Sequence, residues 1–162
     1  MSVTSQGVAN ATTYGLGAHE TLVANDQYEV LVGGAGTDIY QIGAHAQTDL
    51  IETWNNPSDA THSNTVDFSA ANSDQLWFQR QGSDLLVSVI GTSTQADISG
   101  WYNSAANEVQ QFTAADGKSL AATQVNALVQ AMAAFAPPAA GVTQLPSNEQ
   151  TALHPVLAAS WH

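Results

Sequence analysis

The chain is 162 residues long, a length that suits one domain with an appended tail. Fourteen acidic residues against two basic ones, Arg80 and Lys118, give a net charge of −12, which excludes nucleic acid and anionic membrane surfaces as electrostatic partners. The absence of cysteine excludes disulfide bonds, thiolate nucleophiles and cysteine-ligated zinc.

A nine-residue period begins at Gly15. Three consecutive units, GLGAHETLV, ANDQYEVLV and GGAGTDIYQ, each have an acidic residue at the sixth position (Glu20, Glu29, Asp38) and a large residue at the eighth. This period predicts a turn that glycine permits, followed by a very short strand with one inward side chain. Two units then form one coil of a parallel roll, and residues eighteen positions apart stack on the same side.

The third unit, residues 33–41, resembles the GGxGxDxUx repeat of RTX (repeat-in-toxin) calcium-binding proteins at every fixed position. Calcium takes about 6–8 oxygen ligands, and turns rich in glycine expose carbonyl oxygens. Glu20 and Asp38 lie eighteen positions apart, so their carboxylates should meet on one side of the roll and repel each other unless a cation neutralises them. We therefore expect one Ca²⁺ between turn 17–20 and turn 34–38. The expected ligands are the carboxylates of Asp38 and Glu20 and turn carbonyls at Gly34, Gly36, Gly17 and Ala18.

Two departures from the repeat leave an alternative open. Glu20 has one methylene more than the aspartate of the repeat, and the second unit contains no glycine. The residue eighteen positions after Glu29 is Gln47, so the spacing does not indicate a second site at Glu29. A degenerate roll that keeps its shape without binding metal is the alternative interpretation.

From Thr48 onward the pattern changes to longer strands separated by polar turns. The strands are predicted at residues 65–68, 75–81, 85–90, 96–101 and 109–113, with hairpin turns at Gly82-Ser83 and Asp116-Gly117. Residues 64–120 resemble the β-rich region that follows the repeats in haemolysin-type calcium-binding proteins, notably in DQLWFQRQGSDLLVSVIGT, ISGWY and VQQFTAADG. The resemblance implies that this segment caps the roll.

After Lys118 the sequence becomes rich in alanine, and an amphipathic helix is expected. Its apolar stripe consists of Val125, Leu128, Val129, Met132 and Phe135, and Pro137-Pro138 stops it. Beyond these prolines we expect at most one short helix, because Pro155 interrupts the segment, and then a flexible end that contains Trp161. The most apolar run, residues 128–142, is too interrupted to cross a bilayer, so membrane insertion is not expected.

The resemblance implies the fold, the organisation and the location of the chain. The fold class would be mainly β: residues 1–47 form a short, degenerate RTX β-roll, residues 48–120 an antiparallel cap, and residues 121–162 a helix and a type I secretion tail. Proteins of this family carry an uncleaved secretion signal at the extreme C-terminus, and the N-terminus here shows no Sec signal peptide. The resemblance therefore implies a toxin-related module of a larger bacterial protein, secreted by the type I machinery. Outside the cell, calcium would bind the folded form and drive folding.

The sequence does not indicate an enzyme. It contains no HExxH, GxSxG or P-loop motif, and its five histidines show no metal-ligand spacing. Trp77 and Trp101 are predicted to pack in the core, whereas Trp54, beside a polar loop, is the better candidate for an exposed ring. An adhesin-like or glycan-binding module with a metal-free roll is therefore the alternative function.

Overall fold

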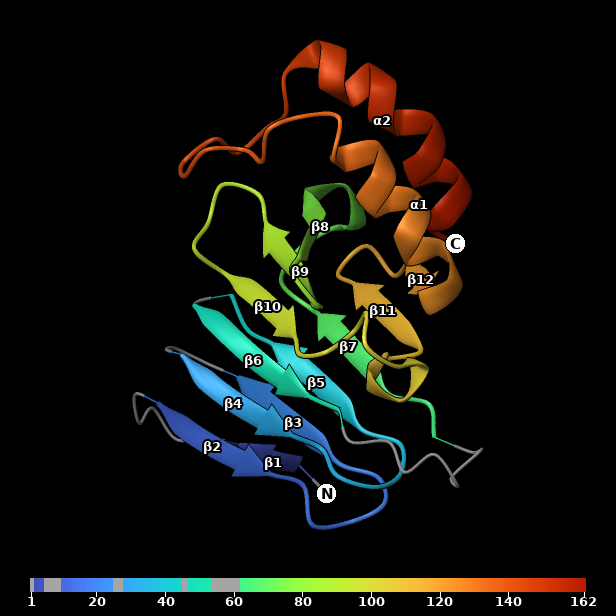
Figure 1. Ribbon diagram of the computed structural model, residues 1–162. Coiled ribbons are helices and arrows are strands. Elements are labelled where there is room, and N and C mark those ends of the chain that lie inside the picture. Colours follow the sequence, from blue (N-terminus) through green and yellow to red (C-terminus); the bar gives the residue numbers. More distant parts are fainter. Residues whose placement is uncertain (1, 5–9, 25–27, 45–46, 54–61) are drawn as a thin grey trace.

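The computed structural model describes residues 2–4, 10–24, 28–44, 47–53 and 62–162. In this part of the chain, two six-stranded sheets stack face to face, and two helices lie at the end of the molecule away from the N-terminal strands (Figure 1). The expected fold class, mainly β with a C-terminal helix, is confirmed.

Seven short strands wind alternately into the two sheets and form the roll. They are β1 (Ser2–Thr4), β2 (Ala11–Tyr14), β3 (Thr21–Ala24), β4 (Glu29–Val32), β5 (Ile39–Ile42), β6 (Thr48–Glu52) and β7 (Thr65–Phe68). We call the sheet that begins with β1 the odd sheet and the sheet that begins with β2 the even sheet. Neighbouring roll strands are parallel in both sheets. Leu22 pairs with Tyr40 and Ala11 with Glu29, which is the eighteen-residue register that the nine-residue period predicts.

Five further strands extend both sheets towards the helices. They are β8 (Leu76–Gln81), β9 (Asp84–Val89), β10 (Gln95–Ile98), β11 (Gln111–Ala114) and β12 (Ser119–Ala121). β10 is parallel to β6 but antiparallel to β9, and β11 is parallel to β7 but antiparallel to β12. Parallel pairing therefore continues beyond the nonapeptides, and the antiparallel pairs stand at the outer end of each sheet.

The strands of the cap differ from the prediction mainly at their ends. The strand predicted at 96–101 ends at Ile98, because Gly100 adopts a positive φ of 66° and turns the chain. The strand predicted at 75–81 begins one residue later, since a 3₁₀ turn, Ser73–Gln75, precedes it. A second 3₁₀ turn, Ala105–Asn107, delays the next strand to Gln111. Both predicted hairpin turns are present, and Gly82 and Gly117 supply the positive φ angles.

The core lies between the two sheets, and the first helix closes one end of it. Helix α1 (Ala122–Met132) packs against β8 and buries Val125, Leu128 and Met132 of the predicted stripe. It ends before Phe135, the last residue of that stripe, and Val129 is half-buried. Inward side chains of the roll strands that are aliphatic or aromatic fill the core. They include Leu22, Leu31, Tyr40, Ile51 and Val66.

The tail differs from the prediction in two ways: its helix is long, and its last residues are held against the rest of the fold. Helix α2 (Ser147–Ser160) runs through Pro155, although an internal proline costs about 3 kcal/mol. Tertiary packing offsets this cost: α2 contacts α1, Leu153 is fully buried, and Trp161 packs beside Phe78. The backbone of His162 exchanges two hydrogen bonds with Ser119, so the final residues extend the odd sheet at β12. Neither described helix is long and apolar enough to cross a membrane.

Candidate functional site

A ladder of polar side chains runs along the edge of the roll where strands of the even sheet turn into strands of the odd sheet. The backbone N–H of Glu20 donates to Asp38 Oδ1 at 3.1 Å, and the N–H of Asp38 donates to Asn64 Oδ1 at 2.8 Å. The N–H of Asn64 in turn donates to Gln110 Oε1 at 2.6 Å. Each of these residues comes directly before a strand of the odd sheet, and Glu20, Asp38 and Asn64 are buried. Along this ladder, acids occupy the first two positions and amides the next two.

The opposite edge of the roll carries a second pair of acids. Glu29 and Asp49 are buried, and the N–H of Glu29 donates to Asp49 Oδ1 at 3.0 Å. β4 and β6 pair with an offset of twenty residues, not eighteen, because the unit between them is longer by two. The residue expected opposite Glu29, Gln47, is exposed. The fixed spacing was therefore wrong here, and matching an acid followed directly by consecutive apolar residues would have found Asp49.

The structure brings together the two carboxylates that the sequence predicts as calcium ligands. Asp38 is fully buried and Glu20 is 6% exposed. Asp38 Oδ2 and Glu20 Oε2 are buried and accept no hydrogen bond within the described residues. Buried carboxylate oxygens without a donor are costly, so both atoms are suited to receive a cation. Whether the set of ligands is the expected one remains a prediction.

Glycine is required in both turns because the carboxylate oxygens occupy the space that a side chain at these positions would need. A Cβ on Gly15 would come within 2.6 Å of Glu20 Oε2 and would also meet the carbonyl of Gly33. A Cβ on Gly33 would come within 2.7 Å of Asp38 Oδ2 and would also meet the hydroxyl of Tyr40. Gly15, Gly33 and Tyr40 are not among the site residues that the sequence predicts. Gly15 and Gly33 stand at the first position of their repeat units, and this shared position could have indicated their role.

The other expected ligands lie in these two turns. Gly34 and Gly36 have positive φ angles of 79° and 113°, the conformation that the repeat glycines predict. The carbonyl of Ala18 accepts the N–H of Thr37 at 2.8 Å, which holds one turn on the other. Gly17 lies over the Glu20 carboxylate, with 3.2 Å between its missing Cβ and Oε1. All the residues expected at the site therefore belong to one stacked pair of turns.

The charge of the buried acids is not balanced by lysine or arginine. Lys118 pairs with Asp116 at 3.7 Å, and Arg80 stacks at 4.3 Å from the ring centre of Tyr102, both in the cap. Burial raises the pKa of Asp38; the charge of Glu20 adds to this, while the N–H of Glu20 and the charge of His19 oppose it. The positive charge that neutralises the roll must therefore come largely from bound protons or from a cation in solution.

A metal at this edge cannot rely on side chains alone. In the described ranges, no three His, Cys, Asp or Glu side chains gather closely enough to hold an ion. Calcium would bind the carboxylates of Glu20 and Asp38 and complete its shell with turn carbonyls and water, a mixture of oxygen ligands that it accepts. The carboxylate and carbonyl donors of these turns are oxygen atoms, which fit a hard cation such as calcium.

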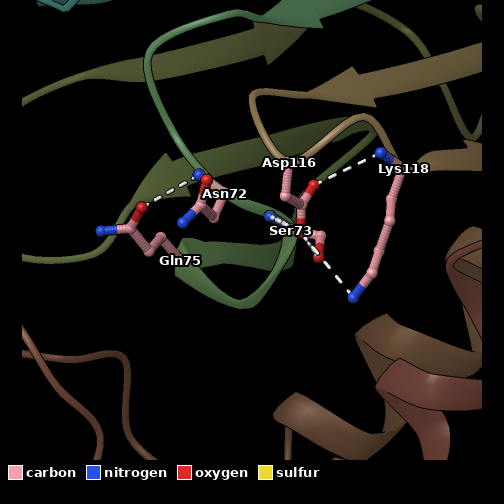
Figure 2. A network of polar contacts seen from close by, with 5 residues as sticks. All are labelled: Asn72, Ser73, Gln75, Asp116 and Lys118. Carbon is pink, nitrogen blue, oxygen red and sulfur yellow. Dashed lines mark hydrogen bonds and ion pairs between the residues drawn. The ribbon is translucent and has the colours of Figure 1, made fainter.

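A separate polar network joins the β11–β12 hairpin to the 3₁₀ turn before β8 (Figure 2). The hydroxyl of Ser73 donates to Asp116 Oδ2 at 2.6 Å, and Lys118 lies on the same carboxylate. Burial acts to raise the pKa of Asp116, but the hydrogen bonds from Ser73 and Lys118 outweigh it and lower the pKa. Ser73 is 2% exposed, so this network holds the cap together and does not present a nucleophile.

The tryptophans give little support to a glycan platform. Trp77 and Trp101 are each 2% exposed, which confirms that they belong to the core. Trp54, the candidate for an exposed ring, lies outside the described residues. Exposed aromatic rings in the described part of the chain include Tyr14 and Tyr28, on different strands or turns of the roll.

Comparison with known families identifies the cap. Residues 84–124 match the model of the haemolysin-type calcium binding protein related domain. This segment comprises β9 to β12 and the first residues of α1, and β8 stands between it and the last strand of the roll. The resemblance seen in the sequence is therefore confirmed for residues 84–124.

Proposed function

We propose that this chain, which carries a haemolysin-type calcium-binding related domain at residues 84–124, is a non-catalytic calcium-binding module of the RTX type. The observation that carries the proposal is the pair Glu20 and Asp38. Their carboxylates are buried on successive coils, have oxygens that accept no hydrogen bond from the described residues, and have no lysine or arginine beside them. The ion would lie between the two stacked turns.

Calcium binding at this place is coupled to folding. In the unfolded chain, both carboxylates are hydrated and far apart, and the turn carbonyls do not converge. The folded chain brings them together and removes them from water, at a cost that the cation offsets. An ion that binds only the folded form stabilises it by about 2.7 kcal/mol at a hundredfold excess over its Kd.

The same proposal covers the location and origin of the chain. Calcium is scarce in the cytosol, so the roll would stay unfolded there and pass through a type I exporter. It would then fold outside the cell as part of a larger bacterial protein. The division predicted from the sequence, into a roll (1–47), a cap (48–120) and a secretion tail (121–162), belongs to this proposal, with β6 and β7 added to the roll because they pair in parallel with β4 and β5. Its support is the family of the cap together with the buried acids of the roll.

Thermal unfolding in calcium and in EGTA tests the proposal. We expect calcium to raise the Tm by several degrees and magnesium to raise it less, because magnesium demands a stricter octahedral site. Asp38→Asn should remove most of the calcium response. This variant should still fold, since an asparagine already performs the same hydrogen bonding at Asn64, one coil further on.

The matched control is Glu29→Gln, an equally buried acid at the opposite edge. It should keep the response that Asp38→Asn loses, and the reverse order would place the ion at the other edge. Equal melting curves in calcium and EGTA would remove the site. The chain would then have a metal-free roll, as the adhesin-like alternative assumes, and retention on a glycan array would be the next measurement.

A further inference from the structure

Tyr40 has a hydroxyl group that packing does not require. It occupies the position that the repeat gives to a large residue, in the middle of β5, and it is fully buried. Its neighbours in the same row of the odd sheet are aliphatic, Leu22 on one side and Val66 on the other. The hydroxyl is buried and donates to no acceptor among the described residues, while the backbone N–H of Gly33 acts on its oxygen. A phenylalanine would fill the same space without burying a polar group.

The hydroxyl and Asp38 Oδ2 both lie over Gly33, although no hydrogen bond joins them in the structure. Asp38 Oδ1 already accepts the N–H of Glu20, so Oδ2 is the oxygen left for another partner. A Cβ on Gly33 would meet both the Tyr40 hydroxyl and Asp38 Oδ2, and its distance to the latter would be 2.7 Å. The space over Gly33 is thus shared by a carboxylate without a donor and a hydroxyl without an acceptor.

We infer that Tyr40 is a positioning residue of the calcium site, whose hydroxyl turns to the Asp38 carboxylate when the ion binds, donates to it and orients it towards the ion. The inference rests on the proposed function. A carboxylate that binds a metal is commonly held by a second hydrogen bond, and loss of that bond weakens metal affinity by about 10–100-fold. Gly33 belongs to the same arrangement, because any side chain there would separate the two groups.

Tyr40→Phe tests the inference by calcium titration calorimetry on the full chain. We expect the Kd for calcium to rise about tenfold, while the Tm in EGTA stays the same or increases, since a hydroxyl without an acceptor is removed. The matched control is Tyr28→Phe. Tyr28 is exposed and comes directly before Glu29, at the opposite edge of the roll, so its substitution should leave the Kd for calcium unchanged. Calcium should also produce a tyrosine ultraviolet difference spectrum in the parent chain and in Tyr28→Phe, but not in Tyr40→Phe.

The outcomes separate the two proposals. If the parent chain binds no calcium, both the proposed function and this inference fall. If it binds and Tyr40→Phe binds with the same Kd, Tyr40 is a packing residue and only this inference falls.

A second measurement does not depend on metal. Gly33→Ala should lower the Tm in EGTA, and adding Tyr40→Phe should restore part of the loss, because the new methyl group gains the space of the hydroxyl. An equal loss in both backgrounds would contradict the geometry.

Discussion

The residue directly before the strands β3, β5, β7 and β11 of the odd sheet changes from acid to amide along the sheet. Glu20 and Asp38 are followed by Asn64 and Gln110, yet the side-chain oxygen accepts the preceding N–H at each step. Amides make this hydrogen bond without charge, so the ladder itself does not need a cation. The negative charge of Glu20 and Asp38 is therefore not needed for the hydrogen bonds of the ladder. For this reason we attribute the charge to metal binding and not to the shape of the roll.

Adding a third acid to the ladder should therefore destabilise the metal-free chain. We expect Asn64→Asp to lower the Tm in EGTA by on the order of 5 °C, because it buries a carboxylate next to Asp38. Asn103→Asp, at an exposed position, is the control and should change the Tm little. Equal Tm values for the two variants would mean that the ladder tolerates charge.

The second acidic pair predicts a dependence on pH. Burial raises the pKa of Asp49 to about 7; the Glu29 N–H opposes this shift, and the charge of Glu29 adds to it. A carboxyl whose pKa is higher in the folded chain than its ordinary 3.8 stabilises the fold when protonated, and this contribution is lost as the pH rises through about 7.

In EGTA, we expect the Tm to fall by on the order of 5 °C between about pH 5 and about pH 8 on account of Asp49. The measurement is the difference between the parent chain and Asp49→Asn over this range. The difference should vanish if Asp49 ionises normally in the folded state.

At the scale of the element, the turns determine where substitution is tolerated. Gly36 has a φ of 113°, and a Cβ there would lie 2.8 Å from the Cα of Ala18 in the stacked turn. Gly82 has a φ of 64° in the β8–β9 hairpin, and no described residue lies within 4 Å of its missing Cβ. Both glycines have a positive φ that strains any other residue, but only at Gly36 would a side chain also clash with the stacked turn.

Gly36→Ala should consequently cost more than Gly82→Ala. For Gly82→Ala we expect about 1 kcal/mol, a few degrees in Tm, from the left-handed backbone alone. Gly36→Ala should lower the Tm at least twice as far, because the turns must also separate. Chemical denaturation of both variants gives the comparison, and equal losses would show that the turns do not stack as described.

At the scale of the whole molecule, the tail is part of the folded unit. Trp161 is 5% exposed and contacts Phe78, and the strand-like pairing of His162 with Ser119 fixes the end of the chain. A tail that acts in export would therefore be accessible to an exporter only before folding.

We expect Trp161→Ala to lower the Tm by about 10 °C, since truncating a buried aromatic ring costs about 3–5 kcal/mol. His154→Ala, on the exposed face of α2, should have little effect and serves as the control. If the two variants melt together, the end of the chain does not contribute to the stability of the cap.

Much of the fold follows from local patterns in the sequence. The nine-residue period predicts the stacking of Leu22 on Tyr40, and the stripe from Val125 to Met132 predicts which face of α1 is buried. These features repeat at a fixed spacing, so the sequence alone contains the information.

The features that the sequence did not predict depend on contacts between distant residues. Asp49 was missed because two additional residues shift the register, and the packing of Trp161 outweighs the local effect of Pro155. The Tyr40 hydroxyl and the Asp38 carboxylate both lie over Gly33, and this arrangement is possible only because Gly33 has no side chain. Propensity and periodicity do not include such tertiary terms.

The parallel pairing of cap strands with roll strands has a kinetic consequence. β10 reaches back to β6, with Gln95 opposite Thr48, and β11 reaches back to β7, with Gln111 opposite Thr65. Pairs so distant in sequence require long loops to close, which slows folding. Once these distant pairs have formed, the N-terminal coils can add to the folded cap one after another, since each coil contacts mainly its neighbour. An ion held between two of these coils would act late on the pathway, so it should prolong the lifetime of the native state more than it accelerates its formation.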